Sequence, residues 1–276
     1  MPASGSPAPD PPCVAVYRRR VKASLERIFE NVLDWEHLPW LHERSFCGIT
    51  LEEEGPWGWR ACVQLPPRER PQQIGLELRL DRAARCYHAR TLWGPGTGTD
   101  IRTTLTELGP RETEICVEFT VPGTPPADAE RVGAAFRALY RRLWDEDEAM
   151  MQVRQDFLDG RREGVLRPGG AWPPLELGPV EQLRASLPRV VEAHGHRFRV
   201  LELQGELLAH TLVCPHRGGP LGEGRIEGHR VLCPWHGYRF DLRSGEGPPG
   251  QRCRLPVPAR IEVDPATRVA RLELGR

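Results

Sequence analysis

Between residues 46 and 121 the chain repeatedly alternates hydrophobic and polar positions. An alternation with a period of two is typical of strands that bury one face, so it predicts a series of β-strands here. Turn-forming glycine and proline residues separate the runs, for instance in GPGTG at 94–98. The runs are ITLEEEG, GWRACVQL, QIGLELRL, CYHARTLW, DIRTTLTEL and EICVEFTV.

One more strand and a helix are expected ahead of this region. Residues 14–23, VAVYRRRVKA, predict the strand, and SLERIFENVLDWEHL at 24–38 carries hydrophobic residues at helical spacing. Ser24 is suited to cap this helix, because a serine oxygen can accept a hydrogen bond from a backbone N–H of the first turn. Pro39 is expected to interrupt the helix, since proline has no backbone N–H to donate.

A longer helix is predicted from about residue 128 to residue 158. Phe136, Leu143, Met150 and Phe157 repeat every seven residues, and we expect this stripe to be the buried face of the helix. Beyond the helix, glycine and proline accumulate as in a linker, and short strands with turns follow to the end of the chain.

These elements predict an α+β protein with two domains. A tail at 1–13, rich in proline, serine and alanine, is expected to be disordered. An α+β domain is placed at 14–162, a linker at 163–174 and a small all-β domain at 175–276.

Composition narrows the functional classes. The 276 residues include 38 basic and 38 acidic side chains, so no basic excess points to nucleic acid or an anionic membrane as a partner. We find neither an apolar run long enough to span a bilayer nor a secretory signal, so a cytoplasmic location is expected. In that reducing environment disulfides are unexpected, and the eight cysteines are free thiols or metal ligands.

Two segments of the second domain share a cysteine–histidine pattern. CPHRGGPL contains Cys214 and His216, and CPWHGYRFD contains Cys233 and His236. Two cysteines and two histidines are a common zinc-binding set, so a zinc site is one interpretation. Proline after each cysteine and glycine near each histidine indicate rigid turns instead of the helix of a zinc finger.

The two segments together resemble the ligand loops of the Rieske [2Fe–2S] domain, in which two histidines replace two cysteines on one iron. The resemblance implies that Cys214, His216, Cys233 and His236 hold a [2Fe–2S] cluster. It also implies that the two histidines lie nearest the surface, where electrons are exchanged. A ferredoxin or a flavin reductase is the expected electron donor.

A second histidine pattern lies near the end of the first predicted helix. Asn31, Asp34, His37 and His42 are spaced N-x2-D-x2-H-x4-H. Histidines five residues apart on a regular helix point about 140° apart and cannot share a metal. A bend at Pro39 would turn the second histidine back toward the first. Without that bend, the segment is a helix end with two partly exposed histidines, and this interpretation stays open.

The long helix offers a carboxylate that could complete a metal site. A mononuclear non-haem iron site commonly uses two histidines and one carboxylate. Asp147 lies within about 40° of the centre of the buried stripe, whereas Asp145 and Glu148 are expected to point away and Glu146 lies at the margin. A buried carboxylate needs a cation or a proton-sharing partner. Iron would satisfy Asp147, and a salt bridge to an inward arginine is the alternative.

These residues are similar to the mononuclear iron motif of Rieske non-haem iron oxygenases, and EDEAMMQ is similar to the helix that carries its third ligand. The resemblance implies that His37, His42 and Asp147 bind Fe(II). It further implies that Asp34 is a catalytic carboxylate that bridges to a Rieske histidine of a neighbouring subunit, with Asn31 beside the ligands. The implied assembly is a homo-oligomer, a trimer in the family.

The order of elements in the first domain resembles the START-like helix-grip fold, an antiparallel sheet with a long C-terminal helix. In Rieske oxygenases the cluster domain usually comes first, whereas here it follows the predicted iron domain. The predicted function is therefore an oxygenase that uses O2 and externally supplied electrons to hydroxylate, dealkylate or desaturate an apolar small molecule. Trp40, Trp57, Trp59 and Met151 are candidates to line the substrate cavity.

Two other interpretations remain. One is a Rieske electron-transfer protein fused to a START-like ligand-binding domain without catalytic iron, and the other is a structural zinc protein. The number and the kind of bound metal ions separate all three.

Overall fold

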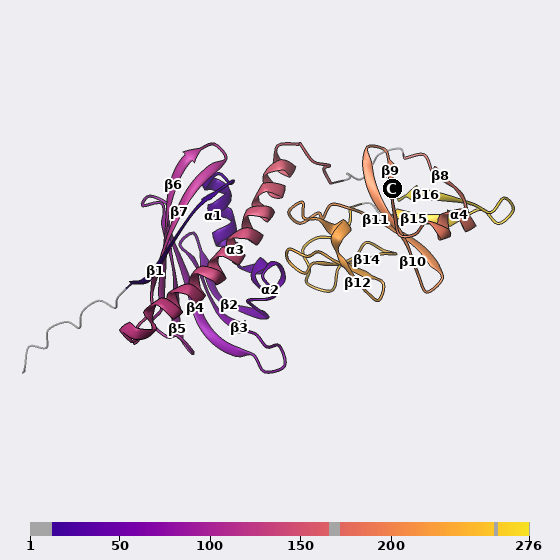
Figure 1. Cartoon of the computed structure of the whole chain (residues 1–276). Helices are drawn as coiled ribbons and strands as arrows, with labels where there is room; N and C mark the ends of the chain where they lie inside the picture. Colours follow the sequence, from indigo (N-terminus) through magenta and orange to yellow (C-terminus); the bar gives the residue numbers. More distant parts are fainter. Residues whose placement is uncertain (1–12, 166–171, 257–258, 276) are drawn as a thin grey trace, which may run out of the picture. The chain divides into compact units, whose positions relative to one another are not determined.

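The computed structural model of the chain describes residues 13–165, 172–256 and 259–275 (Figure 1). The chain forms two compact units, of which one ends at Gln152 and the other begins at Val153. Each unit is described below by itself.

The residues around the predicted domain limits are described only in part. The tail predicted at 1–13 lies outside the described residues except for Cys13, which begins the first strand. Half of the linker predicted at 163–174 also lies outside them, because residues 166–171 are not described. Along the sequence, the boundary between the two units falls inside the long helix, ahead of the predicted linker. The limits predicted at 162 and 175 stay predictions.

The first unit is built on one antiparallel sheet of seven strands, in the order β1-β7-β6-β5-β4-β3-β2 (Figure 1). Each of the six runs predicted between residues 46 and 121 forms a strand, so the alternation was interpreted correctly. The strands are β1 Cys13–Val21, β2 Gly48–Gly55, β3 Gly58–Leu65, β4 Gln72–Asp81, β5 Cys86–Trp93, β6 Asp100–Gly109 and β7 Glu112–Thr120.

The alternation places one row of side chains of each strand in the hydrophobic core. In β7 the side chains of Thr113, Ile115, Val117 and Phe119 are inaccessible to solvent, and the residues between them are partly exposed. Successive side chains of a strand point to opposite faces of a sheet, so a single row can fill the core while the other meets water. The long helix α3 packs against this buried face, where Trp144 and Met151 join the core.

The first helix ends earlier than predicted. The hydroxyl of Ser24 accepts a hydrogen bond from the backbone N–H of Arg27 and caps α1 (Leu25–Leu33). The backbone leaves the helix at Asp34, whose φ and ψ are −87° and 82°. The indole N–H of Trp59 donates to the carbonyl of Val32 at 3.0 Å, and it thereby satisfies one acceptor that the ending helix leaves unpaired.

The prediction that Pro39 interrupts the helix was therefore wrong in position. A short 3-10 turn, η1 (Trp35–His37), follows Asp34, and α2 (Leu38–Leu41) then begins with Pro39 in its first turn. Proline is well tolerated there, because the first N–H groups of a helix have no partner within the helix. Asp34 precedes both histidines, so their relative directions are set between them, where the 3-10 turn passes into the short helix α2 and His42 follows its end.

The helix α3 (Ala129–Leu158) follows a 3-10 turn, η2 (Pro126–Asp128), close to the predicted limits. The predicted stripe was only partly correct, because of its four residues only Met150 is fully buried, while Gly133 and Trp144, outside the stripe, are buried as well. A Cβ atom on Gly133 would lie 2.6 Å from a backbone oxygen of β1, so only glycine permits this close approach of helix and sheet.

The prediction that Glu148 points away from the core was wrong. Its side chain is buried, because the guanidinium of Arg19 on β1 binds it and the backbone N–H of Lys22 donates to it at 2.9 Å. These partners come from a distant part of the sequence and compensate the carboxylate for its loss of water.

The second unit has short strands and little helix. One sheet has the order β8-β16-β15-β11-β10-β9, a second has the order β12-β13-β14, and Phe198, Val200 and Leu272 lie in the core of the unit. The elements are β8 Leu175–Pro179, α4 Val180–Ala185, β9 Arg189–Ala193, β10 His196–Leu203, β11 Glu206–Thr211, η3 Leu221–Glu223, β12 Arg225–Glu227, β13 Arg230–Leu232, β14 Arg239–Asp241, β15 Ala259–Val263 and β16 Val269–Leu274. The predicted α+β class, with a helix-grip domain followed by an all-β domain, is confirmed.

No helix among the described residues combines the length and the apolar character that a membrane span requires.

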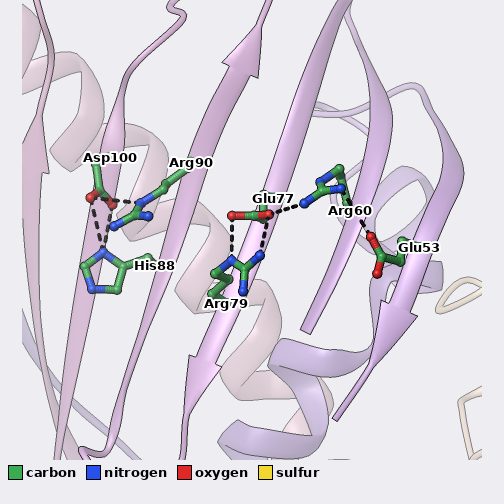
Figure 2. Close-up of polar contacts among 7 residues, drawn as sticks. All are labelled: Glu53, Arg60, Glu77, Arg79, His88, Arg90 and Asp100. Atoms are coloured by element: carbon green, nitrogen blue, oxygen red, sulfur yellow. Dashed lines mark hydrogen bonds and ion pairs between the residues drawn. The ribbon is translucent and has the colours of Figure 1, made fainter. Parts of the chain in front are cut away.

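The other face of the seven-stranded sheet carries charged side chains that pair across strands (Figure 2). Glu77 of β4 lies between Leu76 and Leu78, which face the core, so its carboxylate lies on the opposite face. Arg60 donates to it at 2.7 Å and Arg79 at 2.8 Å, and it is 5% exposed. A second group on the same face joins His88, Arg90 and Asp100 (Figure 2).

Replacing Glu77 by glutamine should lower the free energy of unfolding by about 1–3 kcal/mol, because two arginines lose a charged acceptor. The hydrogen bond from Arg79 is the largest effect on the pKa of Glu77 and, with Arg60, keeps it below its ordinary value although burial opposes this. The stabilisation is therefore complete above the ordinary pKa, about 4.3, and disappears as the pH falls through the lowered pKa.

Thermal unfolding followed by circular dichroism at pH 7 and pH 3 measures both effects. The difference between wild type and Glu77→Gln should be large at pH 7 and small at pH 3. Glu107→Gln is the control, since this exposed carboxylate pairs with Arg85 at 3.8 Å and should matter little. An equal difference at both pH values would contradict the role of the Glu77 charge.

Candidate metal centres

The structure brings together the three predicted ligands of the mononuclear site. His37 ends η1, His42 directly follows α2, and Asp147 lies on α3. One potential ligand atom of each lies within 4.8 Å of the other two, and no other triad of this kind occurs among the residues described. The Nε2 atoms of His37 and His42 lie 3.5 Å and 3.1 Å from Oδ1 of Asp147.

These distances and donors fit a metal ion. Nitrogen and oxygen ligands bind at about 2.0–2.2 Å, so two ligands of one ion are about 3.0–3.4 Å apart. Two neutral imidazoles with one carboxylate on the same side of an ion leave other positions open, as non-haem Fe(II) sites require. His37 and His42 are 4% and 2% exposed, so the site is shielded from bulk water.

Two neighbours orient the ligands. The amide of Asn31 on α1 donates to Oδ1 of Asp147 at 3.0 Å, so Asn31 lies beside this candidate ligand. Nδ1 of His42 lies 2.6 Å from Oε2 of Glu146. If Nε2 of His42 binds a metal, Nδ1 carries the proton and donates it to Glu146, so this carboxylate selects the tautomer that binding requires.

Charge couples these groups strongly. Burial disfavours the protonated form of His42, but Asp147 and Glu146 outweigh burial and raise the pKa of His42 to about 9. Burial also opposes the ionised form of Asp147, yet His42, His37 and Asn31 keep the pKa of this carboxyl below its ordinary value. Without a metal, the site is therefore a buried ion pair. A metal cation would take the place of the His42 proton.

A cavity of about 110 Å³ opens beside this triad. Asp34, which is 6% exposed, lines it, as does Trp59. Trp40, Trp57 and Met151 are not among the lining residues, so only one of the four expected candidates lies there. The lining consists of Asn31, Val32, Asp34, His37, Leu38, His42, Phe46, Trp59, Leu76, Leu78, Tyr87, Ala89, Tyr140, Leu143, Trp144 and Asp147.

In the second unit two loops of similar geometry carry the cysteine–histidine pattern. One loop follows β11, and the other joins β13 to β14. In each loop a glycine four residues after the cysteine donates its N–H to the cysteine carbonyl, Gly218 to Cys214 at 3.0 Å and Gly237 to Cys233 at 2.9 Å. Both glycines have positive φ values, 76° and 64°, which glycine adopts without strain.

The four candidate ligands of these loops face one another in pairs. The rings of His216 and His236 are perpendicular, with centroids 4.7 Å apart. A hydrogen bond between the two buried thiols raises the pKa of Cys214 and lowers that of Cys233 to about 7. Two thiols on one side and two imidazoles on the other are the donor set of a [2Fe–2S] cluster with mixed ligands.

Two residues beside these sites were not among the predicted site residues. Tyr238 stacks on His216 with centroids 4.1 Å apart, which holds that imidazole in place. Glu146 was predicted to lie at the margin of the buried face of the helix. Its position directly before Asp147 was a weak signal that it could contact the site. Its contact with His42 arises only from tertiary structure.

Comparison with known proteins identifies the second unit. Residues 174–255 match the family model of the Rieske [2Fe-2S] domain. The carboxyl-terminal part of the chain is therefore a Rieske domain, a class of module that binds a [2Fe–2S] cluster and transfers electrons. This match supports the cluster interpretation over the zinc interpretation.

The matched relatives include both electron carriers and oxygenases. The chain is 33% identical over 88 residues to the ferredoxin component of the p-cumate 2,3-dioxygenase system of Pseudomonas putida, covering 32% of this chain and 66% of that protein. It is 34% identical over 80 residues to the oxygenase component of 3-ketosteroid-9-alpha-monooxygenase of Mycolicibacterium smegmatis, covering 29% and 19%. The chain thus spans less than two thirds of the length of each of these relatives.

Solved structures are similar to the other part of the chain. A START superfamily protein from Mycobacterium smegmatis has a TM-score of 0.41 and 19% identity, over 49% of this chain and 97% of that one. The Zhui aromatase/cyclase from Streptomyces sp. R1128 has a TM-score of 0.42 and 13% identity, over 51% and 94%.

Proposed function

We propose that the chain is a Rieske-type non-haem iron oxygenase, with its mononuclear Fe(II) site in the amino-terminal unit. The observation that carries this proposal is a cluster of three potential metal ligands in the same chain as a Rieske domain. One ligand atom each of His37, His42 and Asp147 lies within 4.8 Å of the other two. A Rieske domain in the same chain could supply the electrons that a mononuclear iron needs for O2 activation.

The chain's own groups would divide the work between the two centres. Cys214 and Cys233 would hold one iron of the cluster, and His216 and His236 would hold the other, where an electron enters and leaves. His37, His42 and Asp147 would hold Fe(II), which supplies O2 activation when bound. Asn31 and Glu146 orient these ligands, and the largely apolar cavity beside them would receive the substrate.

The predicted partners belong to this proposal. A ferredoxin or a flavin reductase would deliver electrons, and O2 and an apolar small molecule would be the substrates. The bridging role of Asp34, the homo-oligomeric trimer and the cytoplasmic location stay predictions from the sequence.

Metal analysis of the purified full chain tests the proposal. An oxygenase should contain about three iron atoms and about two sulfide ions per chain. Nitric oxide added to the reduced protein should give the EPR signal of a mononuclear Fe(II)–nitrosyl complex. About two iron atoms without that signal would show the alternative, a Rieske electron carrier fused to a ligand-binding domain, and zinc in place of iron would contradict both.

Replacing Glu146 by glutamine should weaken Fe(II) binding about 10- to 100-fold, because the hydrogen bond from His42 loses its charged acceptor. The measurement is titration with Fe(II) against a chelator, after dialysis that removes the mononuclear metal and leaves the cluster. Glu130→Gln on the same helix is the control, since this carboxylate is exposed and pairs only with Arg137 among the contacts described. Equal affinities of wild type and Glu146→Gln would contradict the orienting role of Glu146.

A further inference from the structure

The cavity beside the metal triad is lined mostly by apolar side chains, with a few polar groups among them. Its apolar lining is aromatic or aliphatic, and its polar groups are the metal-site residues, the hydroxyls of Tyr87 and Tyr140, and the indole N–H groups of Trp59 and Trp144. No arginine or lysine lines it within the described part of the chain. The carboxylate of Asp147 already receives Asn31, and both histidines face it, so the metal-site groups are committed to one another.

Tyr140 differs from the metal-site residues, because its hydroxyl makes no hydrogen bond to the described residues. Its ring packs edge-on against Phe119, with centroids 4.9 Å apart, and this contact fixes the ring between the core and the cavity. Among the residues that the structure describes, none exchanges a hydrogen bond with the Tyr140 hydroxyl. Burial, together with the charges of Tyr87 and Asp147, raises the pKa of Tyr140, so it remains a neutral donor.

A tyrosine hydroxyl is a hydrogen-bond donor, so an uncommitted hydroxyl in a cavity wall can bind an acceptor atom of a ligand. Polar groups of this kind set the orientation of ligands in otherwise apolar pockets. An anionic ligand is disfavoured, because the cavity offers no arginine or lysine and contains carboxylates. The cavity measures about 110 Å³ and is not closed, so a single ring can lie partly inside it, since a closed engineered cavity of about 150 Å³ holds one benzene molecule.

We propose that the cavity binds a small neutral molecule of about one ring that carries an oxygen acceptor, and that the Tyr140 hydroxyl donates a hydrogen bond to this oxygen. The inference rests on the proposed function only in taking the cavity beside Asp147 as the substrate site. It deepens that function, because Tyr140 would select oxygen-bearing rings over plain hydrocarbons and would fix which carbon lies nearest the metal triad.

Binding of two probes of similar shape tests the proposal. Benzaldehyde carries an acceptor oxygen where styrene carries a CH2 group. Ligand-observed NMR titrations of the oxidised full chain, without a reductant, give both dissociation constants with no turnover. Tyr140→Phe should weaken the binding of benzaldehyde about 3- to 10-fold and leave the binding of styrene unchanged, because the ring remains and only the donor is lost.

Two further variants make the result decisive. Leu143→Phe narrows the same cavity and should weaken both probes, which locates their binding. Tyr17→Phe removes a hydroxyl from a tyrosine of β1 that does not line the cavity and should change neither. Equal effects of Tyr140→Phe on the two probes, or wild type that binds neither at millimolar concentration, would overturn the proposal. Since no step of this test uses Fe(II), its failure is distinguishable from a failure of the iron analysis.

Discussion

Replacing His37 by alanine should remove the mononuclear iron and abolish oxygenase turnover, while the visible spectrum of the Rieske cluster stays unchanged. His37 provides one of only two imidazoles in the triad, and its Nε2 lies 3.5 Å from the Asp147 carboxylate. With one imidazole and one carboxylate left, the ion loses a third of its protein ligands. The iron content should fall from about three to about two per chain.

The measurement combines iron and sulfide analysis with EPR of the reduced protein after nitric oxide. His88→Ala is the matched control, because His88 pairs with Asp100 on the opposite face of the same sheet. It should retain the full iron content and the nitrosyl signal. A nitrosyl signal that survives in His37→Ala would remove His37 from the ligand set, and a bleached cluster would show that this histidine supports the Rieske domain instead.

The sheet of the first unit could be predicted from the sequence because its information is local. In β7 a hydrophobic residue returns at every second position from Ile115 to Phe119, and each of these side chains is buried. The cluster loops were predictable for a similar reason, since Cys214 and His216, and Cys233 and His236, each lie within one short turn. Local spacing is sufficient where one turn or one strand determines the geometry.

The position at which the first helix ends could not be predicted in this way. Pro39 is the strongest local signal for a helix break, yet the chain leaves the helix at Asp34. The early end is stabilised by Trp59, a residue of β3 that reaches the carbonyl of Val32. Tertiary contacts of this kind override local preference, and the sequence does not reveal them.

The environment of the carboxylates on α3 was only partly predictable. Helical periodicity correctly predicted that Asp147 faces the inside of the domain. It also predicted that Glu148 faces solvent, as charged residues of a helix usually do, and this was wrong. Glu148 is buried because Arg19 from β1 binds it. The contact of Glu146 likewise depends on the fold, because its partner His42 lies at the end of a different helix, α2. The partner of a charge is decided by the fold, whereas its angle on the helix is decided by the sequence.

Replacing Asp34 by asparagine should slow reoxidation of the reduced protein by O2 at least about tenfold without changing its metal content. Asp34 is 6% exposed, lies three residues before His37 and lines the cavity beside the metal triad. Asparagine keeps the shape of the side chain and removes its charge, so the substitution tests the predicted role of the carboxylate in electron transfer. Stopped-flow absorbance of the pre-reduced cluster after mixing with O2 measures the rate.

Three readouts distinguish a role in electron transfer from a structural one. The cluster reduction potential, the iron content and the nitrosyl EPR signal of Asp34→Asn should all equal those of wild type. Glu43→Gln, an exposed carboxylate next to His42 in sequence, should reoxidise at the wild-type rate. If Asp34→Asn also reoxidises at that rate, the electron does not pass through this carboxylate. A slower rate accompanied by lost iron would instead assign Asp34 to holding the metal ligands in place.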